Sequence, residues 1–141
     1  MSRARYYRRD GTPIEDVLTW ARLFENIAYK RVAETFLDDG TRISTIWIGL
    51  DHSFVEIYGD DRPPLIFESM VFSPETKKSE LVLSGEVHEF HEDWDCERYS
   101  TEAEAIMGHD RLVRKWKEIR EQFKTLSPRE GSPGQEKPNH N

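Results

Sequence analysis

The sequence has one cysteine, no long apolar run and none of the common catalytic signatures. Cys96 cannot form an internal disulfide, so the reducing cytoplasm is the expected location. No apolar run approaches the ~20 residues of a membrane helix, and the basic start of the chain lacks the apolar stretch of a signal peptide. Glycine-rich phosphate loops, Gly-x-Ser-x-Gly, His-Glu-x-x-His and paired-cysteine motifs are also missing. The sequence therefore predicts no membrane contact and no cofactor, and an enzyme is the less favoured expectation.

The composition is that of one small folded domain with a polar end. The chain has 141 residues, of which 36% are hydrophobic and 11% aromatic. That aromatic content predicts a packed core rather than a disordered chain. We expect a single domain over residues 1–125 and a disordered tail over residues 126–141, which are rich in Pro, Gly, Ser and Glu.

Charge is distributed unevenly along the chain. The formal net charge is −7. Residues 1–9 hold four arginines and no acid, residues 10–110 hold 23 acids and 8 bases, and residues 111–141 hold 8 bases and 4 acids. The acidic residues 10–110 repel nucleic acid unless the basic ends of the chain form a separate face. Nucleic-acid binding is therefore disfavoured.

The first half of the chain reads as a turn, a helix and a hairpin. Asp10-Gly11 predicts a turn after a short extended segment. Apolar residues at helical spacing predict a helix from Glu15 to Asn26. Lys30 to Leu37 and Thr41 to Leu50 predict two strands of a hairpin, because both are rich in β-branched and aromatic residues and Gly40 suits the turn between them.

The second half predicts strands followed by a long helix. Leu65 to Phe72 is almost continuously apolar, which predicts a central strand, and we expect Pro74 to close it ahead of a loop that continues to Glu80. Further strand candidates cover residues 81–83, 87–90 and 94–99. Ser100 or Thr101 caps a helix that reaches about Lys124, with Glu104 completing a capping box. The fold class is α+β, with a mainly antiparallel sheet of about four or five strands, one short N-terminal helix and one long C-terminal helix.

Three blocks of the sequence resemble a known family. The blocks are Ser-Thr-Ile-Trp-Ile-Gly-Leu-Asp-His at 44–52, Pro-Leu-Ile-Phe-Glu-Ser-Met-Val-Phe at 64–72 and Arg-Tyr-Ser-Thr-Glu-Ala-Glu-Ala-Ile-Met-Gly-His at 98–109. They are similar to an uncharacterised family of small bacteriophage, prophage and bacterial proteins, over roughly residues 6–115. The resemblance implies an origin in a phage or mobile element, and it implies no activity.

One set of residues has the chemistry of a small active site. Asp51 and His52 follow a predicted strand, Glu68 interrupts an apolar strand, and His109 lies on the apolar side of the long helix. Two histidines and one or two carboxylates could bind a metal or form an acid–base pair. The favoured interpretation is structural: Glu68 bonds a histidine or a hydroxyl such as that of Thr45, and His109 is a satisfied core histidine.

Two further groups of polar residues are weaker candidates. His88, His91 and Cys96, with Asp93 and Asp95, form a dense local set of possible metal ligands. Zinc sites usually need a second ligand pair at defined spacing, so a chance surface cluster is favoured. Cys96 itself is interpreted as a small buried hydrophobe.

The long helix carries a run of basic residues. Its bases are Arg111, Arg114, Lys115, Lys117, Arg120 and Lys124. A solvated outer face is the ordinary explanation. The alternative is an electropositive face that binds an acidic partner together with the N-terminal arginines.

The leading hypothesis is an accessory protein of phage or mobile-element type that binds a host or phage protein. Small size, segregated charge, a disordered tail and the missing catalytic signatures favour it. The expected contact surfaces are two loops, residues 51–63 and the acidic residues 86–95. The alternative is a small metal-assisted hydrolase that uses His52, Glu68, His109 and Asp51. The hydrolase requires these side chains to converge in space.

Overall fold

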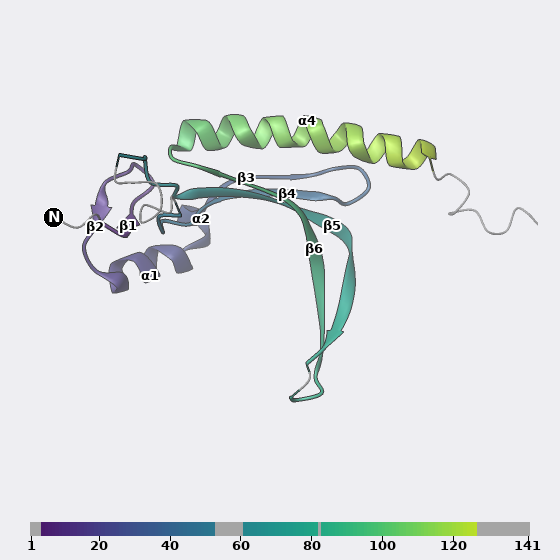
Figure 1. Ribbon diagram of the computed structural model, residues 1–141, viewed down its shortest axis with the longest axis horizontal. Helices are drawn as coiled ribbons and strands as arrows, with labels where there is room; N and C mark the ends of the chain where they lie inside the picture. Colours follow the sequence, from purple (N-terminus) through teal and green to yellow (C-terminus); the bar gives the residue numbers. More distant parts are fainter. Residues whose placement is uncertain (1–3, 53–60, 82, 127–141) are drawn as a thin grey trace, which may run out of the picture.

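The computed structural model describes residues 4–52, 61–81 and 83–126 and has the expected α+β architecture. In chain order the elements are β1 (Tyr6–Tyr7), β2 (Pro13–Ile14), α1 (Val17–Glu25), α2 (Ile27–Lys30), β3 (Arg31–Phe36), β4 (Arg42–Trp47), β5 (Phe67–Glu80), β6 (Val87–Tyr99) and α4 (Glu102–Leu126). β3 to β6 form an antiparallel sheet in sequence order, and β1 pairs with β2 in a small second sheet. The long helix α4 lies along one face of the four-stranded sheet (Figure 1).

The predicted turn, helix and hairpin of the first half are confirmed. Gly11 and Gly40 both adopt positive φ, at 91° and 94°, as the two turns require. Asp16 caps α1 by accepting a hydrogen bond from the backbone N–H of Thr19. The hairpin of β3 and β4 has one irregularity near Arg31.

The second half differs from its prediction at the strand ends. β5 does not close at Pro74 but continues to Glu80, and β6 is one strand where two separate segments, 87–90 and 94–99, were expected. A third strand was expected at 81–83, but Leu81 and Leu83 belong to the connection between β5 and β6 and not to a strand of their own. Pro74 is tolerated because the register shifts between Phe72 and Thr76, so its missing N–H interrupts no regular ladder. The polar composition of 73–80 reflects a two-stranded ribbon exposed on both sides rather than a loop.

The long helix begins as its capping box predicts. The N–H of Glu104 donates to the Thr101 hydroxyl at 3.1 Å, and the N–H groups of Ser100 and Thr101 donate to the Glu104 carboxylate. The helix then continues through Leu126, slightly past the predicted end. The predicted tail was residues 126–141, so its first residue, Leu126, belongs to α4 instead. Residues 127–141 lie outside the described residues, as do residues 53–60.

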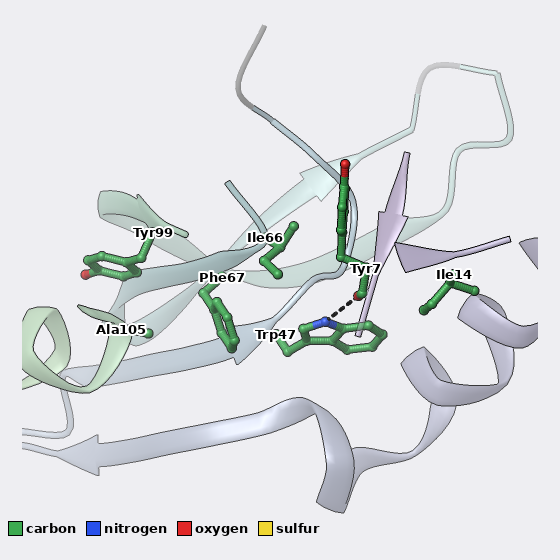
Figure 2. Close-up of a cluster of buried hydrophobic side chains, with 7 residues drawn as sticks. All are labelled: Tyr7, Ile14, Trp47, Ile66, Phe67, Tyr99 and Ala105. Carbon is green, nitrogen blue, oxygen red and sulfur yellow. Dashed lines mark hydrogen bonds between the residues drawn. The ribbon is translucent and has the colours of Figure 1, made fainter. Parts of the chain in front are cut away.

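The core has two parts, and Trp47 is at the centre of the larger one. Its indole is fully buried and its N–H donates to the carbonyl of Tyr7 at 2.9 Å (Figure 2). Phe24 and Tyr29 bring their rings against it, so the N-terminal segment is held on the end of the sheet. The smaller part lies between α4 and the sheet, where Leu112 packs on Ile43 and Val71.

Candidate functional site

The residues proposed for a small active site do not converge. Thr45 is directly opposite Ser69 in the sheet, and His109 bonds Thr45, so these three share the face that α4 covers. Glu68 is the neighbour of Ser69 and therefore points to the opposite face. There it pairs with Arg98, whose Nε donates to its carboxylate at 3.1 Å. The structure thus separates Glu68 from His109, and the suggested bond from Glu68 to Thr45 is wrong.

Asp51 and His52 bond to the backbone at the two ends of a connection, and they do not form a cluster with His109. The Asp51 carboxylate accepts a hydrogen bond from the backbone N–H of Leu65 at 3.1 Å. The His52 ring donates through Nδ1 to the carbonyl of Leu50 at 2.9 Å, and its backbone N–H bonds the carbonyl of Leu65. Both residues thereby join the segment after β4 to the segment before β5, on either side of residues 53–60.

His109 belongs instead to a buried chain of hydrogen bonds under α4. Its Nδ1 lies 2.7 Å from the hydroxyl of Thr45 and its Nε2 lies 2.8 Å from that of Thr35, so both ring nitrogens are satisfied. The Thr45 hydroxyl is also bonded to that of Ser69, which is bonded in turn to the Tyr99 hydroxyl. This confirms the interpretation of His109 as a satisfied core histidine. Four strands and the helix contribute to this network.

Burial affects the acid–base properties of two members of this network. Desolvation lowers the pKa of His109, which favours the neutral ring. Desolvation, together with a hydrogen bond to the Glu97 carboxylate, raises the pKa of Tyr99 to about 12. A neutral imidazole between hydroxyls and an un-ionised tyrosine specify how the helix packs. The network offers no activated base or nucleophile.

Gly108 allows α4 to approach this network, and its substitution should be costly. A Cβ at Gly108 would lie 2.3 Å from the ring and hydroxyl of Tyr99. Tyr99 is buried and bonded to Ser69 and Glu97, so it cannot swing away without losing those bonds. We expect Gly108→Ala to lower the free energy of unfolding by about 1–3 kcal/mol, although alanine is the better helix former. Urea unfolding checks this, with Ala103→Gly, which weakens an exposed helix position by about 1 kcal/mol, as the control.

The second predicted set of ligands is also dispersed. His88 lies 3.3 Å from Glu86, while His91 donates to the carbonyl of Ser73. Cys96 is exposed beside Glu68 and Arg98, so its interpretation as a buried residue is wrong. Its strand position explains this, because it alternates with residues that face α4. The described part of the chain holds no group of three or more His, Cys, Asp or Glu side chains placed to bind a metal.

Several bases of the long helix are bound to acids of the sheet rather than displayed to solvent. Arg111 pairs with Glu97 at 2.7 Å, Lys115 with Asp95 at 2.8 Å, and Arg120 with Asp39 at 2.8 Å. Burial opposes ionisation of Asp95, but hydrogen bonds from Lys115 and Trp116 outweigh it and lower its pKa. Arg9, similarly, binds the Glu102 carboxylate through two nitrogens. These charges fasten α4 to the domain.

The feature that remains is an arm formed by the ends of β5 and β6. Residues 75–81 and 83–91 project away from the sheet, on the side opposite α4 (Figure 1). The arm exposes large apolar side chains: Leu81, Leu83, Val87 and Phe90. Leu83, near the tip, is 100% exposed. A group of exposed apolar side chains on a projecting element is typical of an interaction surface.

Ser73 fixes the base of the arm. This residue is 4% exposed, its hydroxyl donates to the carbonyl of Glu75 at 2.8 Å, and the same oxygen accepts from the N–H of Glu92 at 2.9 Å. The carbonyl of Ser73 accepts from His91. A salt bridge of 2.8 Å between Lys77 and Glu92 spans the two strands just beyond. The bend of the arm is therefore held by specific bonds.

The sequence contained a signal for this arm that its polarity obscured. Lys77 to Glu80 and Val87 to Phe90 flank a Gly85 turn with positive φ, and each has the length of a strand. Alternation of apolar and polar residues is absent because neither side of the arm is covered by a core. Where solvent surrounds a ribbon, the usual period-2 pattern is lost.

Comparison with known proteins adds nothing to this geometry. No membrane-spanning helix is found in the described residues.

The structure alone defines the candidate site, which is the arm of β5 and β6. No family model, no curated protein and no solved structure matches the chain.

Proposed function

We propose that this chain is a non-enzymatic accessory protein that binds another protein through the tip of the β5–β6 arm. The observation that carries the proposal is the full exposure of Leu83 on a hairpin whose base is fixed by Ser73. An apolar side chain held in solvent contributes nothing to folding, whereas burying it against a partner contributes about 2 kcal/mol. A phage or mobile-element setting for this function rests on the three resembling sequence blocks.

The alternatives have less support. A hydrolase built on His52, Glu68 and His109 needs convergent side chains, and Glu68 points to the face opposite His109. Nucleic-acid binding needs available cations, yet Arg111, Lys115 and Arg120 of α4 are in ion pairs with the sheet. Protein binding requires neither, and it uses the apolar surface that the structure exposes.

A pull-down from host lysate tests the proposal. The full chain and a Leu83→Asp variant serve as baits, and we expect at least one protein to be retained by the first and lost with the second. Leu18→Asp is the matched control, because Leu18 is also exposed, at 64%, but lies in α1. Circular dichroism confirms that all three baits are folded. Identical proteins on both the wild-type and the Leu83→Asp baits, or none above background, would refute the role of the tip.

A further inference from the structure

Within the described residues, the arm also has a strand edge that faces no other strand. β6 is last in the sheet order β3-β4-β5-β6, so within the described chain only one of its two edges is paired. The N–H of Leu81 donates to the carbonyl of Glu86, so Glu86 turns its backbone polar groups toward β5. In an antiparallel ladder the direction alternates. Val87, Glu89 and His91 therefore direct their N–H and C=O groups outward, where another strand can pair with them.

The residues along this edge form a self-complementary series. From 88 to 92 the order is His-Glu-Phe-His-Glu. When two such strands pair antiparallel around a two-fold axis at Phe90, His88 lies opposite Glu92 of the second copy and Glu89 lies opposite His91. The two Phe90 rings meet on the axis. Unlike pairs and aromatic pairs directly across a ladder are stabilising, whereas like charges there are destabilising.

The other two-fold registers within this segment lose that complementarity. An axis at Glu89 places two carboxylates opposite each other, and an axis at His88 or His91 places two imidazoles opposite each other. Centring on His91 also sets Phe90 against the carboxylate of Glu92. Among the registers centred on residues 88 to 91, therefore, the one at Phe90 alone sets each imidazole against a carboxylate.

We propose that the β6 edge of the arm pairs with the same edge of a second copy of this chain, in the register centred on Phe90. The side chains can adopt it while the base of the arm stays fixed, because His91 binds the Ser73 carbonyl through Nδ1 and its Nε2 is the atom that meets the opposite carboxylate. Phe90 is 44% exposed, and His88 and Glu86 form a solvent-exposed pair that can open. Glu92 keeps its bond to Lys77, which lies on the other strand of the arm. The outward N–H and C=O groups of Glu89 and His91 supply the backbone bonds of the new ladder.

This self-association uses the side of the arm, whereas the proposed partner binding uses its tip. The two are independent, because the dimer is tested on the purified chain with no partner present. Loss of the dimer would leave the Leu83 pull-down unaffected, and failure of the pull-down would leave the dimer intact.

Cysteine cross-linking tests the register. In a Cys96→Ser background, Phe90→Cys places two thiols on the axis at a non-hydrogen-bonded pair, where the Cα atoms lie about 4.5 Å apart, within disulfide range. His88→Cys is the matched control, since its two copies would be about four residues, or ~13 Å, apart. We expect a covalent dimer from Phe90→Cys and little from His88→Cys under mild oxidation. No dimer from either, or equal yields from both, would overturn the register.

A charge exchange tests the side-chain pairing by sedimentation equilibrium of the full chain. His91→Glu places two carboxylates opposite each other twice per dimer, and we expect the dimer Kd to rise about tenfold, the equivalent of about 1.4 kcal/mol. Adding Glu89→His restores an imidazole opposite each carboxylate, so the double variant should dimerise more tightly than His91→Glu; both variants lack the His91 bond to Ser73, so the comparison between them isolates the side-chain pairing. Thr125→Glu, at the end of α4, controls for charge alone. A monomeric wild type, or a double variant no better than His91→Glu, would refute the pairing.

Discussion

Replacing Trp47 with alanine should lower the free energy of unfolding by about 3–5 kcal/mol. The indole is fully buried, and it packs with Tyr7 near the start of the chain and with Phe24 and Tyr29 of the two short helices. Its loss leaves a cavity that neighbouring rings cannot fill, because Phe24 and Tyr29 approach it from fixed elements. A typical domain is stable by only 5–15 kcal/mol, so the variant would be close to unfolded.

Part of this loss comes from one hydrogen bond, which a second variant isolates. The indole N–H donates to the carbonyl of Tyr7, which is itself buried. Trp47→Phe keeps a large ring but removes the donor, and we expect it to cost about 1–3 kcal/mol. Urea unfolding followed by circular dichroism measures both variants. Phe36→Ala, at a side chain that is 63% exposed, is the control and should change stability by less than about 0.5 kcal/mol. A loss below about 1 kcal/mol for Trp47→Ala would contradict this role.

Local sequence signals predicted the regular elements well where they coincide with a covered face. Gly40 and the β-branched residues around it specify the hairpin, and Thr101 with Glu104 specifies the start of α4. The prediction that the strand ends at Pro74 was wrong, because the effect of a proline depends on the strand register. A proline closes a regular strand, but a bulge absorbs it, and the bulge depends on the partner strand 18 or so residues away.

The candidate site could be predicted only in part: residues 86–95 were expected as a contact surface, but as a loop, whereas Val87 onward is strand β6. The rest depends on pairing at a distance. The side of the sheet on which Glu68 lies follows from the strand register, and residue types alone did not separate it from His109. The arm, in turn, is recognisable only once β5 and β6 are seen to pair beyond the other strands (Figure 1). Ser73 shows why: its bonds to the backbone of Glu75 and Glu92 leave no local pattern in the sequence.

Lowering the pH below 6.5 should destabilise the fold through His109. Burial lowers the pKa of this ring in the folded chain, whereas in the unfolded chain the ordinary value of 6.5 applies. The unfolded state therefore binds a proton first. The full stability contributed by neutral His109 is present above pH 6.5 and is lost as the pH falls toward the folded pKa. The slope in this window is at most about 1.4 kcal/mol per pH unit for a single proton.

The variant His109→Gln separates this contribution from that of the other titrating groups. Glutamine can bond only part of the hydroxyl pair formed by Thr35 and Thr45, so we expect a loss of about 1–3 kcal/mol at pH 8. Glutamine does not titrate, so the gap between wild type and variant should narrow as the pH falls from 6.5 to 5. Carboxylates such as Asp39, whose pKa is lowered by Arg120 against the effect of burial, lose their contribution only in more acidic solution.

Urea unfolding of both proteins at pH 5, 6, 7 and 8 measures this gap. A gap that stays constant over the range would mean that His109 binds its proton equally well in the folded and unfolded states. The geometry argues against that outcome. The ring lies between α4 and the sheet, is 3% exposed, and has only uncharged hydroxyls as its hydrogen-bond partners. The exposed carboxylate of the neighbouring Asp110 favours the positive ring, but its effect is smaller than the desolvation of the ring.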